Sequence, residues 1–219
     1  MKICYIFHGC FTIESDKCAV IIDYVKDTHG ADNRMKVRNI LKNRKIRIYV
    51  LCTNASAENF NSEIFSWRYL HPDIRYILSK DIESAYLPPT CRFMEPNETF
   101  HDELLKIDTV PSSGNGLMFL LNMDGKYLLH AGRSEWAGDT CLFHMHVPYI
   151  DMAFIPMRMG RCRSCSDEAE RMLKNIRVKR ICPMYFGNDF VRFSGFEKTA
   201  AKYDCKYSPC SREGSVITI

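Results

Sequence analysis

The chain has 219 residues, and its 46% hydrophobic content is enough for a large α/β domain with a buried core. Its net charge of +4 is small, with basic and acidic residues mixed along the chain, so we expect no nucleic-acid partner. No run reaches the roughly 18 apolar residues of a membrane helix, and the first residues lack an apolar signal segment. We therefore expect a cytoplasmic protein with no membrane partner, whose eleven cysteines stay reduced.

The first part of the chain predicts an antiparallel meander that leads into a β-α-β unit. Short β-prone runs joined by polar turns predict three strands, and alternating apolar and helical patterns predict the elements after them. The strands are expected at 2–7, 11–15, 18–23, 47–53 and 74–79, and the helices at 32–43, capped by Asp32, and 57–69. The basic run at 36–47 fits the solvated face of the first helix better than a phosphate-binding patch.

The second part predicts a hairpin followed by another α/β pattern. Asp124-Gly125 separates two apolar runs and is the strongest hairpin signal in the chain. Strands are expected at 150–156, 178–184 and 215–219, and helices at 166–176 and 195–202. Because no Pro/Gly/Ser-rich linker interrupts the chain, we expect a single domain over residues 1–219.

Meanders and β-α-β units in this order predict two mixed β-sheets with helices on their outer faces, a four-layer α/β/β/α sandwich. The order and spacing of several segments carry a specific likeness: "YIFHGCFTIES", "AVIIDY", "VLCTNASAENFNSEIF", "YLLHAGRSEW", "IDMAFIPM" and "ICPMYF". Over nearly its whole length the chain resembles the metallo-β-lactamase-fold hydrolases. That resemblance implies a metal-dependent hydrolase ancestry.

In the family, the loop after one strand reads T-H-x-H-x-D-H, because two zinc ions need a dense cluster of imidazole and carboxylate ligands. Laid on this chain, the motif covers residues 53–59, which we call the motif loop. Its four ligand positions are then Asn54, Ser56, Glu58 and Asn59. All three histidines are absent, and glutamate replaces the aspartate.

The resemblance places the remaining ligands at positions that also lack them. The family's bridging carboxylate would stand where Arg133 follows "HAG", and a fixed guanidinium repels a divalent cation. The last imidazole would stand at Tyr185, and a further histidine would stand at Ser112 or Ser113. We therefore expect no catalytic residues, no bound metal and no cofactor, unless zinc is held by other ligands.

One structural hypothesis follows from these substitutions. Glu58 and Arg133 would face each other across the former metal cavity, within a hydrogen-bonded network of Asn54, Ser56, Asn59 and Tyr185. The alternative is that both charged side chains point into water, as most surface charges do.

Other side chains offer weaker signals. Cys162 and Cys165 form a C-x-x-C pair before a helix, and a zinc site there would need partners such as Cys182, Cys205 or Cys210. Buried or surface thiols without a redox or metal role are the other interpretation. His144 and His146 share a strand face and fit a polar edge better than a metal site, while His8 and His130 are interpreted as neighbours of the cavity.

Two functions remain open at this point. The first is a pseudoenzyme that uses the fold as a binding or interaction scaffold, with a small anion at Arg133 as a candidate ligand. The second is a metal-dependent hydrolase with relocated ligands, for instance Glu58, His130, His144 and His146.

Overall fold

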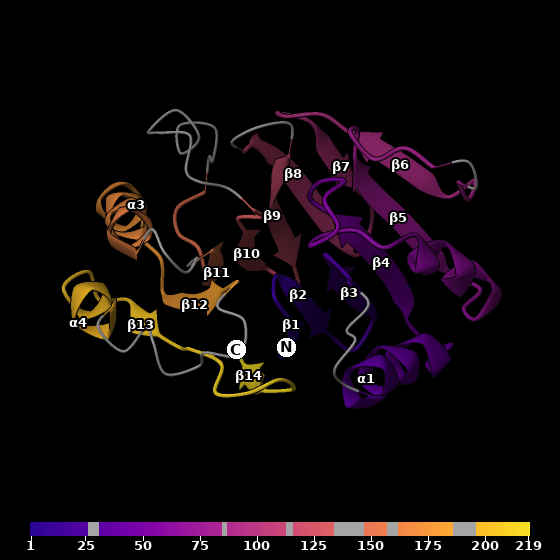
Figure 1. Ribbon diagram of the computed structural model, residues 1–219, viewed down its shortest axis with the longest axis horizontal. Coiled ribbons are helices and arrows are strands. Elements are labelled where there is room, and N and C mark those ends of the chain that lie inside the picture. Colours follow the sequence, from indigo (N-terminus) through magenta and orange to yellow (C-terminus); the bar gives the residue numbers. More distant parts are fainter. Residues whose placement is uncertain (26–30, 85–86, 113–115, 134–146, 157–161, 186–195) are drawn as a thin grey trace. The chain divides into compact units, whose positions relative to one another are not determined.

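The computed structural model describes residues 1–25, 31–84, 87–112, 116–133, 147–156, 162–185 and 196–219, with the backbone alone for 31–34, 162–166 and 168. The described chain separates into two compact units; Figure 1 labels their strands. Unit 1 contains Met1–Glu95 together with Glu213–Ile219, and unit 2 contains Pro96–Arg212. The sequence-based expectation of one domain over 1–219 stays a prediction.

Unit 1 is built on one mixed sheet, which in the described chain has seven strands in the order β14-β1-β2-β3-β4-β5-β6. The pairs from β14 to β3 are antiparallel, and the pairs from β3 to β6 are parallel. Its strands are β1 (Lys2–Phe7), β2 (Cys10–Glu14), β3 (Cys18–Ile22), β4 (Arg47–Cys52), β5 (Ile74–Ser79), β6 (Cys91–Met94) and β14 (Val216–Thr218). Its helices are α1 (Ala31–Lys42) and the 3₁₀ helix η1 (Ser62–Tyr69).

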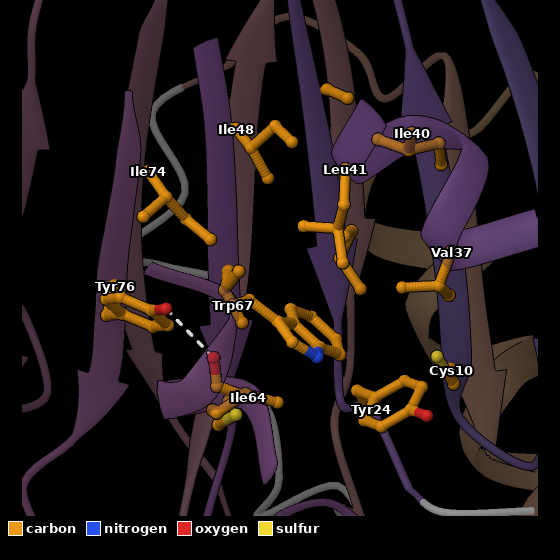
Figure 2. Packing of buried hydrophobic residues seen from close by; sticks show 14 of the residues in the cluster. Cys10, Tyr24, Val37, Ile40, Leu41, Ile48, Ile64, Trp67, Ile74 and Tyr76 are labelled. Carbon is orange, nitrogen blue, oxygen red and sulfur yellow. Dashed lines mark hydrogen bonds between the residues drawn. The ribbon is translucent and has the colours of Figure 1, made fainter. Parts of the chain in front are cut away.

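The core of unit 1 lies between its sheet and these two helices. Val37, Ile40 and Leu41 of α1 share one cluster with buried side chains of the strands (Figure 2). Trp67 of η1 stacks edge-on against Tyr24, with ring centroids 4.7 Å apart. The helices thereby cover one face of the strands.

Unit 2 contains the second mixed sheet, with seven strands in the described chain in the order β13-β12-β11-β10-β9-β8-β7. The strands are β7 (Thr99–His101), β8 (Leu105–Pro111), β9 (Leu117–Met123), β10 (Lys126–His130), β11 (Met152–Pro156), β12 (Arg180–Met184) and β13 (Lys206–Tyr207). The helices are α3 (Cys162–Asn175) and α4 (Phe196–Ala201). Pairs from β7 to β10 are antiparallel and pairs from β10 to β13 are parallel.

Most of the predicted elements are confirmed within a few residues. The hairpin is present, with Asp124 at φ 50° and Gly125 at φ 73°, as a two-residue turn with both residues left-handed requires. The α-helix predicted over 57–69 is wrong in type and extent. Asn61 caps η1 by accepting a hydrogen bond from the Glu63 backbone N–H, and the residues before it form polar turns instead.

Four strands were not predicted from the sequence: β6, β7, β8 and β13. Two of them, β7 and β13, are only three and two residues long, so their patterns are too short to be periodic. Among the described helices, none combines the length and apolar character needed to cross a membrane.

Candidate functional site

The motif loop of unit 1 begins where β4 ends, beside the end of β3. Ile22 at the end of β3 is in register with Leu51, so the residues that follow the two strands are neighbours. Asp23 follows β3 with a left-handed backbone, φ 51°, and its N–H donates to the Leu51 carbonyl at 2.9 Å. This geometry turns the Asp23 side chain toward the start of the motif loop.

Asp23 is the centre of a buried hydrogen-bond cluster, although the sequence patterns predicted no role for it beyond ending a strand. The Thr53 backbone N–H donates to Oδ1 at 2.7 Å, and the Thr53 hydroxyl donates to Oδ2 at 2.7 Å. The Asn59 amide donates to the same Oδ2 at 2.6 Å. All three residues are 0% exposed, so these bonds replace the water that each group has lost.

Burial raises the pKa of Asp23 to about 7, because removal from water disfavours the charged carboxylate. The hydrogen bonds from Thr53 and Asn59 act in the opposite direction, since they favour the ionised form. A carboxyl group buried beside the motif loop therefore has a pKa close to neutral pH.

The amide side chains of the motif loop bond to Asp23 and to neighbouring hydroxyl and backbone groups. Asn59 accepts from the Ser56 hydroxyl at 3.0 Å and donates to both Asp23 and the Thr53 hydroxyl. Asn54 accepts from the Ser56 N–H at 2.9 Å and donates to the Thr53 hydroxyl at 3.3 Å. Three of the four predicted positions are thus brought together, in a network organised around Asp23.

The fourth position, Glu58, has an exposed side chain, as has Arg133. These two residues belong to different units, so their predicted pairing stays a prediction. The carboxylate that the structure places against the motif loop from outside is Asp81, just beyond β5, which accepts from the Ala55 N–H at 3.1 Å.

In unit 2, His130 ends β10 as a fully buried side chain. The Gly132 N–H donates to its Nδ1 at 3.2 Å, so this ring nitrogen is an acceptor and the proton of the neutral ring lies on Nε2. The predicted positions Arg133 and Tyr185 follow the ends of β10 and β12, and Tyr185 is buried at 7% exposure.

The backbone is strained at two of these positions. Tyr185 has φ 63° and His8 has φ 52°, a region that bulky side chains rarely adopt. The His8 ring contacts Phe7 in the turn between β1 and β2, with centroids 3.9 Å apart. Asp23 shares this left-handed conformation, so three residues that follow strand ends adopt it.

Other predicted residues carry no further structural information. Ser113, His144 and His146 lie outside the described residues, and the side chains of Cys162 and Cys165 are likewise outside them. Ser112 is half-buried, and its N–H donates to the Gly116 carbonyl at 3.3 Å.

The thiols nearest the motif loop, Cys10 and Cys52, have pKa values raised by burial and by the Asp23 charge, so neither is an activated nucleophile.

The donor set of the motif loop does not fit a divalent metal ion. Zinc prefers imidazole, thiolate and carboxylate ligands, whereas the loop offers amides and a hydroxyl that are already hydrogen-bonded, together with a single carboxylate, Glu58, which is exposed. Within the described part of the chain, no three His, Cys, Asp or Glu side chains are grouped so that they could hold a metal.

Solved structures share the fold of this chain over nearly its full length. A novel metallo hydrolase from the archaeon Ignicoccus hospitalis, Igni18, matches with a TM-score of 0.73 over 99% of this chain and 97% of its own, at 16% identity. The chain has the metallo-β-lactamase fold. YhfI, a metallo-β-lactamase fold protein from Bacillus subtilis, matches with a TM-score of 0.71 over 99% of both chains, at 10% identity.

The metallo-β-lactamase fold is also shared with the short form of human tRNase Z, at a TM-score of 0.62 and 12% identity over 100% of this chain and 99% of that one. No family model matches the sequence, and no curated protein matches it. The fold class predicted from the sequence, an α/β sandwich of two mixed sheets, is confirmed by these structures.

Sequence reasoning found the motif loop but missed Asp23. The available signal was a single aspartate directly after the apolar run "CAVII", at the carboxyl end of a strand next to the motif loop. A buried carboxylate is recognisable only when its donors are known, and here the donors lie 30 and 36 positions further along the chain.

Proposed function

We propose that this protein is a non-hydrolytic metallo-β-lactamase-fold protein, a pseudoenzyme that uses the fold as a binding or interaction scaffold. The observation that carries the proposal is the Asp23 cluster. Its hydrogen bonds engage the polar groups of Asn54, Ser56 and Asn59, the positions at which the resemblance to the family implies metal ligands. A metal at those positions would have to break several buried or partly buried hydrogen bonds, and it would gain neutral amide and hydroxyl ligands with Glu58 as the loop's single carboxylate.

The scaffold is suited to a small anion, such as a carboxylate or a phosphate, received at Arg133. This guanidinium is exposed on the turn after β10, where Gly132 is left-handed at φ 57°. A planar guanidinium with five donors binds a carboxylate or phosphate through two parallel hydrogen bonds. It would serve this purpose in place of the carboxylate that bridges metals in the family.

Metal analysis of the full chain tests the first part of the proposal. Protein purified without chelators is expected to contain well under one equivalent of zinc, iron or manganese, and to hydrolyse neither β-lactam nor phosphodiester model substrates after these metals are added. One to two equivalents of metal, with hydrolysis that is lost on chelation and with Glu58→Gln, would overturn it in favour of a hydrolase with relocated ligands.

Anion binding is tested separately by thermal shift with phosphate and with small carboxylates at constant ionic strength. At least one anion is expected to raise the Tm of the native protein and of Arg171→Ala, an exposed-arginine control in α3. Arg133→Ala should lose that shift and Arg133→Lys should keep part of it. An equal shift in all four proteins would rule out Arg133 as the anion site.

A further inference from the structure

Two thiols meet in unit 2, away from the motif loop of unit 1. Cys182 lies in β12, and Cys210 lies in the segment that follows β13. Their Sγ atoms are 3.7 Å apart although 28 positions separate the residues in the sequence. The side chains are 0% and 2% exposed, so the two sulfurs are packed against each other with little contact to water.

Cys210 is the anchor of the segment that it belongs to. Pro209, Ser211 and Arg212 around it are exposed, and Cys210 alone among them is buried. The backbone of the same segment is tied to β12 by the Ser208 N–H, which donates to the Ile181 carbonyl at 2.8 Å. A segment with so little buried surface opens locally at a low free-energy cost and closes again.

We propose that Cys182 and Cys210 form a site of reversible oxidation, whose disulfide fastens residues 208–212 to β12. The sulfurs need to approach by under about 2 Å to reach bonding distance, which side-chain rotation and a small shift of an exposed segment supply. Arg212 is the last residue of unit 2, and the chain continues from it into the strand β14 of unit 1. The disulfide would therefore hold in place the end of unit 2 from which the chain continues to β14.

The oxidant is a peroxide, and hydrogen peroxide is small enough to reach the opened segment. The Cys210 thiolate attacks one peroxide oxygen, which breaks the O–O bond, forms a sulfenic acid and releases hydroxide that the thiol proton converts to water. When the segment closes, the Cys182 sulfur attacks the Cys210 sulfur and displaces the hydroxyl group, which leaves as water with the Cys182 proton. Two thiols and one peroxide thus give one disulfide and two waters.

Burial raises the pKa of the Cys182 thiol, so this sulfur reacts slowly with peroxide from solution and acts as the resolving partner. Cys210 is exposed first when its segment opens. The reaction is therefore expected to be limited by that opening, and to respond to sustained rather than brief oxidation.

Peptide mapping of the full-length protein tests the proposal. After treatment with hydrogen peroxide and alkylation of the remaining thiols, a cross-linked Cys182–Cys210 peptide is expected, two hydrogens lighter than the sum of its parts and cleaved by a reductant. Because the cross-link closes a loop of this length, the oxidised protein should show a Tm higher by roughly 5–10 °C, reversed on reduction.

Matched variants separate this pair from the other cysteines. Cys210→Ser and Cys182→Ala should each lose both the cross-linked peptide and the Tm increase. Cys205→Ser, at a buried cysteine directly before β13, should keep both. If a serine at 210 impairs folding, Cys210→Ala provides the same test. An oxidised protein without the Cys182–Cys210 peptide, or with Cys205 cross-linked just as often, would overturn the proposal.

Discussion

Unit 1 and unit 2 repeat the same strand pairings but differ in the chemistry at the strand ends. In each sheet three antiparallel pairs are followed by three parallel pairs. The residue after the last meander strand is Asp23 in unit 1 and Ala131 in unit 2. Each donates its N–H to the next parallel strand, to Leu51 at 2.9 Å and to Phe154 at 3.1 Å, so the two strand ends share this bond, although only Asp23 has a left-handed backbone.

At each of these two strand ends, the residue after the strand and the residue across from it are of the same chemical kind. Counting two residues on from Leu51 and from Phe154 gives Thr53 in unit 1 and Pro156 in unit 2. Thr53 donates two hydrogen bonds to the Asp23 carboxylate, whereas proline has no N–H to donate and Ala131 has no carboxylate to receive one. The same strand pairing thus supports a polar strand end when both partners are present, and an apolar one when both are absent.

Removal of the Asp23 carboxylate is the largest change that can be made to the polar strand end of unit 1. Asp23→Ala gives unit 1 the side chain of unit 2 but leaves the donors of Thr53 and Asn59 buried without their acceptor. We expect a loss of about 3 kcal/mol in the free energy of unfolding, measured by urea denaturation. Asp16→Ala, at an exposed turn, is the control and should cost about 0.5 kcal/mol or less. An equal effect of the two substitutions would show that the cluster does not stabilise the strand end.

The pH dependence of stability sharpens the same contrast. The pKa of Asp23 is raised from 3.8 to about 7 on folding, so between these values the folded chain binds the proton that the unfolded chain releases. This contribution is fully present below about pH 4 and is lost as pH rises through about 7; a shift of about 3 units corresponds to about 4 kcal/mol.

Asp23→Asn is expected to lack that contribution, because its side chain does not titrate. The difference in free energy of unfolding between the native protein and the variant should therefore shrink as pH rises from 4 to 8, measured by denaturant titration at each pH. A difference that is constant with pH, or that grows, would contradict the raised pKa.

Two left-handed glycines, one in each unit, allow the smallest comparison. Gly214 in unit 1 and Gly125 in unit 2 have φ values of 74° and 73°, so alanine meets the same backbone penalty of about 1 kcal/mol at both. A Cβ at 125 meets nothing within 4 Å, while a Cβ at 214 would meet the Lys36 ammonium end.

Gly214→Ala should therefore lower the Tm by a few degrees, and by slightly more than Gly125→Ala, since the flexible lysine can move aside. The excess should disappear when Lys36→Ala is present in both proteins. A larger effect at Gly125 would show that the turn, and not the Lys36 contact, decides the difference.

Local patterns in the sequence predicted those parts of the fold that depend on neighbouring residues. The Asp124-Gly125 hairpin and the helix Ala31–Lys42 follow from turn chemistry and apolar periodicity. The helix expected over 57–69 failed because the polar side chains of residues 53–61 bond to one another and to Asp23, and these tertiary bonds override helix propensity. β14 pairs with β1 from the opposite end of the chain, and no local pattern specifies such a partner.

That the motif loop lacks imidazole ligands follows from the residues alone, because residue identity fixes which atoms can bind a metal. The hydrogen-bond partners of the loop become known only once the chain is folded. The parallel pairing of β3 and β4 brings Asp23 next to the motif loop that contains Thr53 and Asn59. All three residues are then buried, so the carboxylate becomes the centre of a hydrogen-bond cluster.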